Sequence, residues 1–130
     1  MNVGRMLTLA LTVTVLYGCA CVQQGDEGQS SSTGERGEQL LLTGIRAYEN
    51  GKYNEARKAL ETSLKRGLGD RDQVQAHKYL AFIDCISNED AKCRSQFRMA
   101  LTIDPRFELA PAEAGHPIWG PVFRSVKDQR

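Results

Sequence analysis

The stretch GIRAYENGKYNEARKALETS at residues 44–63 decides the fold, because a related stretch, AFIDCISNEDAKCRSQFRMA, follows at residues 81–100. Small and apolar residues recur in both at helical spacing, and a turn signal interrupts each copy. Five positions correspond at a constant offset of 37 residues: Gly44, Gly51, Ala56, Leu60 and Ser63 match Ala81, Asn88, Cys93, Phe97 and Ala100. Each copy therefore predicts one helical hairpin, and the chain predicts two in succession.

Four helices are predicted for these hairpins, separated by residues that end helices. The apolar periodicity runs from about residue 40 to 49, 53 to 66, 70 to 87 and 90 to 103. Asp70 or Asp72 is expected to cap the third helix, and Asp104-Pro105 ends the fourth. No stretch alternates with the period of a strand, so the predicted fold class is all-α.

Beyond about residue 106 the chain predicts a C-terminal cap. Pro117 and Pro121 suit a helix start, which places a final helix at about residues 120–127. Two hairpins alone bury little apolar surface, and the terminal units of helical arrays need a cover. The residues expected to cover the second hairpin are Phe107, Leu109, Trp119 and Phe123.

The repeated pattern resembles the tetratricopeptide repeat, a helical hairpin of about 34 residues. Gly44 and Ala56 match the small residues at which the two helices of that repeat cross, and Leu60 matches its larger apolar residue. Cys93 stands where alanine is usual, and Leu68 stands where the first unit would have its proline. The resemblance implies a small docking module of two such hairpins.

Residues 1–18 have the pattern of a secretory signal peptide. Arg5 precedes an apolar stretch that ends at Leu16 and is shorter than the roughly 20 residues that span a bilayer. The ending Leu16-Tyr17-Gly18-Cys19 resembles the lipobox of bacterial lipoproteins. This resemblance implies cleavage before Cys19 and acylation of the new terminus, which would give a durable anchor. The alternative is a plain secreted protein in which Cys19 is an accidental thiol.

The mature chain is predicted to consist of a tether and one small domain. Residues 19–38 are rich in Gly, Ser, Gln and charge, so a flexible tether is expected there and a helical domain at residues 39–128. Ala20 stands where inner-membrane lipoproteins have Asp, and this resemblance favours the outer membrane, facing the periplasm. The full chain has 17 basic and 16 acidic residues, and cleavage of the signal peptide would remove the basic residue Arg5. The side-chain charges of the mature chain would then balance, which predicts no nucleic-acid partner.

Cys85 and Cys93 flank the turn of the second predicted hairpin. Thiols oxidise in an export compartment, so the preferred interpretation is a disulfide that stabilises a small core. Two buried free thiols are the alternative. Together with His77 they match no zinc spacing, and neither a metal nor another cofactor is predicted. Cys21 would then have no cysteine of the same chain to pair with; it is expected either to remain a free thiol or to form a disulfide with another molecule.

No catalytic residue and no small-molecule substrate are predicted. His77 and His116 are the two histidines, and neither stands at a recognisable spacing from a nucleophile or an Asp partner. The residues proposed to bind protein on the concave side of the array are Arg46, Tyr48, His77 and Asp84. Trp119 and Phe123 are further candidates, with burial against the second hairpin as the alternative.

The segment YLAFIDCISNEDAKCRSQFRMALTIDPRFELAPAEAGHPIWGPVFR, residues 79–124, carries a closer resemblance. Together with the lipobox and the tether, it is similar to the small lipoproteins encoded with bacterial type VI secretion systems, the TssQ-type family. The similarity spans roughly residues 40–127. The matching positions are Cys85, Cys93, the helix end at 97–105, and Phe107, Glu108, Leu109, Pro111, Glu113, Gly115, His116, Pro117, Trp119, Gly120, Pro121 and Phe123. The resemblance implies an accessory adaptor that binds envelope proteins of that machine. The alternatives are an adaptor for pilus assembly, outer-membrane protein insertion or cell-wall growth, or a cell-wall enzyme.

Overall fold

The computed structural model describes residues 28–130, with side chains from residue 32. The predicted signal peptide, the lipidation site Cys19 and the odd thiol Cys21 lie outside the described residues. Within them the fold is all-α, and residues 28–130 contain no strand. The helices are α1 (Gly28–Glu49), α2 (Tyr53–Arg66), α3 (Asp70–Ile86), α4 (Asp90–Ile103), α5 (Pro111–Ala114) and α6 (Trp119–Asp128). None of them is long and apolar enough to cross a bilayer.

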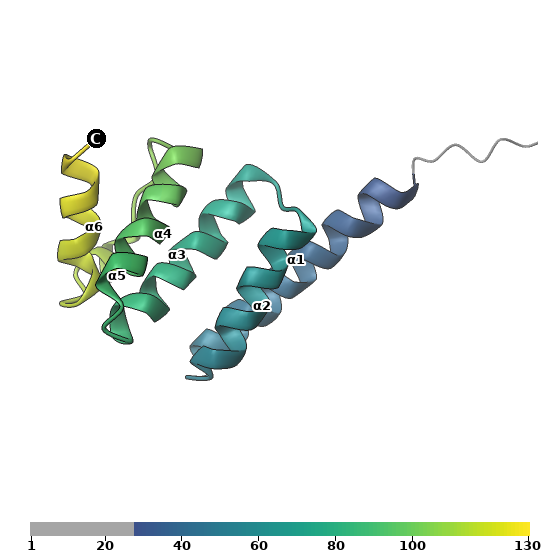
Figure 1. Cartoon of the computed structure of the whole chain (residues 1–130), viewed down its shortest axis with the longest axis horizontal. Helices are drawn as coiled ribbons and strands as arrows, with labels where there is room; N and C mark the ends of the chain where they lie inside the picture. The colour runs from purple at the N-terminus through teal and green to yellow at the C-terminus, as the bar shows by residue number, and fades with distance from the viewer. Residues whose placement is uncertain (1–27) are drawn as a thin grey trace, which may run out of the picture.

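The helices pack side by side in chain order as two hairpins and a cap. The pair α1–α2 lies at one end of the molecule and α6 at the other, with α3 and α4 between them (Figure 1). The predicted succession of two helical hairpins is therefore confirmed.

The two hairpin turns have the same backbone geometry, at positions 37 residues apart. Gly51 and Asn88 are both left-handed, with φ of 72° and 59°. The amide of Lys52 donates to the carbonyl of Ala47 at 2.9 Å, and the amide of Glu89 donates to that of Asp84 at the same distance. Gly and Asn tolerate positive φ better than other residues, which explains why the turn signals Asn50-Gly51 and Ser87-Asn88 stop the helices there.

Equivalent small residues lie at the two helix crossings. Ala56, Leu60, Cys93 and Phe97 are fully buried. A Cβ atom at Gly44 would lie 2.7 Å from Cγ of Leu60, so glycine is needed where α1 meets α2. The second hairpin has alanine at the corresponding position, residue 81, and this alanine is also fully buried. The repeated sequence therefore corresponds to repeated packing.

The C-terminal cap covers the second hairpin as predicted. Phe107, Leu109, Trp119 and Phe123 are all buried. The ring of Phe123 contacts those of Phe97 and Phe107 at centroid distances of 5.2 and 5.6 Å, and Trp119 stacks on Phe82 at 4.4 Å. The short helix α5 was not predicted from the sequence. Pro111 begins that helix, where its missing amide costs nothing.

Two boundaries predicted from the sequence are wrong. Helix α1 runs over Gly28–Glu49, so the helical part begins before residue 39, where the sequence places the start of the domain. The reason lies at Gly37, which is buried against the connector between α2 and α3; a Cβ atom there would lie 2.4 Å from the carbonyl oxygen of Gly67. Asp70 and Asp72 lie in the first turn of α3 and do not cap it, because Gly69 occupies the N-cap position without a side-chain bond.

The outer side of α1 and the outer side of α6 are largely polar. The exposed residues there are Glu35, Gln39, Thr43 and Arg46 on α1, with Arg124 and Asp128 on α6. Leu42 is the large apolar exception on α1, with 53% of its surface exposed. The apolar surface of the domain is therefore directed inward at both ends of the array.

Substitution of Gly37 tests whether the start of α1 packs as described. We expect Gly37→Ala to lower the free energy of unfolding by about 1–3 kcal/mol, because the added methyl group meets backbone that cannot move aside freely. Gly34, one turn earlier, has nothing within 4 Å of a built Cβ atom. Gly34→Ala should be neutral or stabilise by up to about 1 kcal/mol through helix propensity. Equal urea midpoints for the two variants would contradict the packing of Gly37.

Candidate functional site

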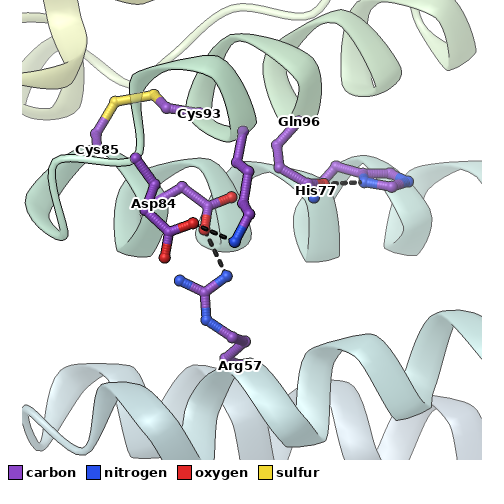
Figure 2. A network of polar contacts seen from close by, with 8 residues as sticks. Arg57, His77, Asp84, Cys85, Cys93 and Gln96 are labelled. Carbon is purple, nitrogen blue, oxygen red and sulfur yellow. Dashed lines mark hydrogen bonds and ion pairs between the residues drawn. A yellow bond between two sulfur atoms is a disulfide. The ribbon is translucent and has the colours of Figure 1, made fainter.

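Two residues predicted to line a binding face are instead buried inside the domain. Asp84 is fully buried, and its Oδ1 atom accepts a hydrogen bond from Nη1 of Arg57 at 2.5 Å. His77 is 8% exposed, and its Nδ1 atom lies 2.7 Å from Oε1 of Gln96 on α4. Figure 2 shows both contacts beside the disulfide. The prediction that His77 and Asp84 contact a partner is therefore wrong: each side chain is used between helices.

The contact between Arg57 and Asp84 joins the two hairpins, since α2 carries the arginine and α3 the aspartate. Oδ2 of Asp84 is buried and has no hydrogen-bond partner among the described residues. Burial raises the pKa of the Asp84 carboxyl above its ordinary value, and the hydrogen bond and charge of Arg57 oppose that rise. The ion pair was not predicted, because a surface arginine and an aspartate in different repeats carry no local spacing signal.

The raised pKa of Asp84 predicts an unusual dependence of stability on pH. The folded chain binds this proton more tightly than the unfolded chain does. Its contribution to stability is therefore complete below the unfolded pKa and is lost as the pH rises through the folded one. Relative to Asp84→Asn, the parent protein should lose stability as the pH rises from about 4 toward neutrality. Urea unfolding of both proteins across this range measures the difference; a constant difference would contradict the assignment.

A disulfide joins Cys85 at the end of α3 to Cys93 in α4, with Cα atoms 5.1 Å apart. Both cysteines are buried, at 2% and 0% exposure. The preferred sequence interpretation is therefore confirmed, and the alternative of two free thiols is not. Cys93 also occupies the position that Ala56 has in the first hairpin, so the bridge replaces a small packing residue without opening the helix crossing.

Removal of the disulfide has an expected cost. In the chain-entropy description, opening so short a loop lowers the free energy of unfolding by about 2–3 kcal/mol. We expect this loss in the double variant Cys85→Ala, Cys93→Ala, measured by urea unfolding. Because alanine fits the crossing at residue 56, the variant should keep its helical circular dichroism spectrum. A midpoint equal to that of the parent protein would show that the bridge does not stabilise the fold.

Glu113 ties the cap to the second hairpin. Its Oε1 atom accepts a hydrogen bond from Nζ of Lys78 at 2.7 Å, and its Oε2 atom accepts one from the amide of Ala110 at 2.9 Å. Its carbonyl oxygen accepts a bond from Nε1 of Trp119 at 2.9 Å. The sequence analysis did not predict these contacts of Glu113. Lys78 was the available signal, because a lysine among the apolar residues of α3 indicates a buried charge that needs a partner.

Trp119 and Phe123 are therefore structural residues of the cap. Trp119 is 8% exposed and Phe123 is 3% exposed, so neither presents its ring to a partner. His116 stacks on Trp119 with nearly parallel rings, and its Nδ1 atom accepts a hydrogen bond from the amide of Ile118. The alternative given for the two aromatic residues, burial against the second hairpin, is confirmed.

The remaining two predicted binding residues, Arg46 and Tyr48, do reach the surface. Arg46 is exposed on α1, and Tyr48 is half-buried. The Tyr48 ring contacts those of Tyr53 on α2 and Tyr79 on α3, at centroid distances of 5.6 and 5.1 Å. Burial, followed by the charges of nearby groups, raises the pKa of Tyr48 to about 12. We call Tyr48, Tyr53 and Tyr79 the tyrosine face.

No metal site stands out in the described part of the chain. Residues 28–130 hold no group of three or more His, Cys, Asp or Glu side chains that could bind a metal. A cleft of about 350 Å³ lies between the start of α3 and the segment after α4. Its charged residues are Asp70, Arg71, Asp104 and Arg106, and no histidine, serine, threonine or cysteine lines it.

Comparison with protein-family models, curated proteins and solved structures gave no match to the chain in any of the three.

Proposed function

We propose that this chain is a lipid-anchored adaptor of the bacterial envelope, facing the periplasm from the outer membrane and binding other proteins through a tetratricopeptide-like domain. The observation that carries the proposal is the disulfide between Cys85 and Cys93. Structural disulfides persist in oxidising compartments and are rare in the cytosol. The disulfide therefore supports the export that the signal pattern and the lipobox at Cys19 predict.

The tyrosine face supports the proposed docking role. Tyrosine is enriched in protein interfaces because its ring buries apolar area and its hydroxyl group forms hydrogen bonds. Three tyrosines from three helices meet here and keep part of their surface exposed.

The machine that we propose it serves is a type VI secretion system. This step rests on the resemblance of residues 79–124 to the TssQ-type lipoproteins. In the structure, four of the positions that carry this resemblance, Phe107, Leu109, Glu113 and Trp119, all belong to the cap. They therefore maintain the fold, and the partner must be recognised elsewhere on the domain.

Affinity capture of the lipoprotein from membranes tests both halves of the proposal. We expect mass spectrometry to find a lipid-modified Cys19 as the first residue and type VI envelope subunits among the captured proteins. The variant Cys19→Ser is the control, since it removes the lipidated thiol and should leave the membrane fraction. If Cys19 is acylated but the captured proteins belong to another envelope system, the type VI assignment is wrong. If Cys19 is unmodified, the proposed lipid anchor is wrong.

A further inference from the structure

The turn of the first hairpin contains the dipeptide Asn50-Gly51, which is chemically reactive. In such a pair the backbone nitrogen of the glycine attacks the side-chain amide of the asparagine, and glycine has no side chain to hinder the approach. Asn50 and Gly51 are both exposed to solvent. The other asparagines of the described chain, Asn54 and Asn88, are each followed by glutamate, whose side chain hinders the same attack. Asn50 is therefore the candidate for deamidation.

The reaction needs no partner other than water. The Gly51 nitrogen forms a bond to Cγ of Asn50, and its proton passes through water to Nδ2, which leaves as ammonia when the bond from Cγ to Nδ2 breaks. The product is a cyclic imide. Water then opens either of the two imide C–N bonds, which gives aspartate or isoaspartate. Both products carry a carboxylate that is ionised at neutral pH, where the asparagine carried no charge.

In the folded chain both reacting groups are held by hydrogen bonds. The Gly51 amide donates to the carbonyl of Tyr48 at 2.9 Å, so its proton is engaged. Nδ2 of Asn50 donates to the carbonyl of Arg46 at 2.7 Å, which directs the side chain back toward the preceding turn of α1. Attack requires both bonds to open, because the nitrogen must give up its proton and the side chain must turn toward it.

We propose that Asn50 is a deamidation site whose rate is set by opening of the turn between α1 and α2. Solvent-exposed backbone hydrogen bonds open more often than those of the core, and the reaction proceeds only from the open turn. The product carboxylate lies at the C-terminal end of α1, where the helix dipole disfavours negative charge. It also replaces the amide that donates to the carbonyl of Arg46. Modification therefore weakens the turn that protected Asn50.

Modification of the turn also bears on the tyrosine face. The turn joins Tyr48 to Tyr53, two of the three residues of that face, and isoaspartate lengthens the main chain between them. A chain modified at Asn50 would therefore present this face in a changed arrangement. The effect on docking rests on the proposed function, whereas the modification itself does not.

Incubation of the purified full-length chain at neutral pH, followed by peptide mass spectrometry, tests the proposal. We expect the Asn50 peptide to gain the mass of deamidation at least about tenfold faster in concentrated guanidinium chloride than in buffer, because unfolding removes the protecting bonds. Peptides that contain Asn54 or Asn88 should stay unmodified over the same time. Asn50→Ser is the matched control, since it keeps a short polar side chain and should abolish the mass gain. Equal rates in the two solvents, or faster modification at Asn54 or Asn88, would overturn the inference.

Hydrogen exchange of the Gly51 amide reports the opening of the same turn in the native protein. Exchange needs only the bond to Tyr48 to open, whereas deamidation needs the Asn50 side chain to be released as well. Folding should therefore slow deamidation at least as strongly as it slows this exchange. Weaker protection against deamidation than against exchange would show that Asn50 reacts without the opening, and the proposed control by the turn would be wrong.

Discussion

Replacement of Phe82 by alanine should lower the free energy of unfolding by about 3–5 kcal/mol, the range expected for truncation of a buried phenylalanine. Phe82 is 2% exposed and lies where the hairpins and the cap meet. Its ring contacts those of Tyr48 on α1, Phe97 on α4 and Trp119 on α6. Truncation therefore opens a cavity that no single helix can close.

Urea unfolding followed by circular dichroism measures this loss, with the disulfide kept oxidised. Met99→Ala is the matched control, because Met99 is a large apolar residue of α4 with 49% of its surface exposed. It should change the free energy of unfolding by no more than about 0.5 kcal/mol. Similar losses for the two variants would show that Phe82 is not at the centre of the core.

Replacement of Arg57 by methionine should cost about 3 kcal/mol, because it leaves the buried Asp84 carboxylate without its counter-charge. We take the lower end of the range for broken buried ion pairs, since the Arg57 side chain is itself 24% exposed. Asp84→Leu should cost less, because the arginine left behind can reach water. The double variant should recover part of the loss, as expected when both charges are removed together.

Thermodynamic measurement of all three variants gives the coupling energy between the two positions. Lys58→Met is a suitable control: Lys58 neighbours Arg57 on α2, is exposed and forms no ion pair with the described residues. The cost of Arg57→Met should also decrease toward acid pH, where Asp84 is protonated. A cost for Asp84→Leu above that for Arg57→Met would reverse the proposed asymmetry.

Local sequence signals were sufficient for the hairpins and the cap. Asn50-Gly51 and Ser87-Asn88 stop helices through their own backbone preferences, and the offset of 37 residues relates two copies of one packing pattern. The disulfide was also predictable, because Cys85 and Cys93 flank a short turn between neighbouring helices.

Contacts between segments distant in the chain were not predictable in this way. Gly37 was interpreted as part of a tether, since nothing nearby in sequence shows that the carbonyl of Gly67 approaches it. The burial of Asp84 depends on Arg57 in the other hairpin, so helical periodicity alone placed this aspartate on a binding surface. The tyrosine face likewise forms only when three separate helices are packed.

The polar outer sides of α1 and α6 also limit the stoichiometry of the domain. Helical arrays lengthen, or stack end to end, when an apolar terminal face meets another of its kind. Here both terminal faces are solvated, so the array has a fixed length and one tyrosine face per chain. If the proposed lipid anchor holds, a gain in avidity would come from several copies anchored in one membrane, and their surface density would set the strength of binding to a partner with repeated sites.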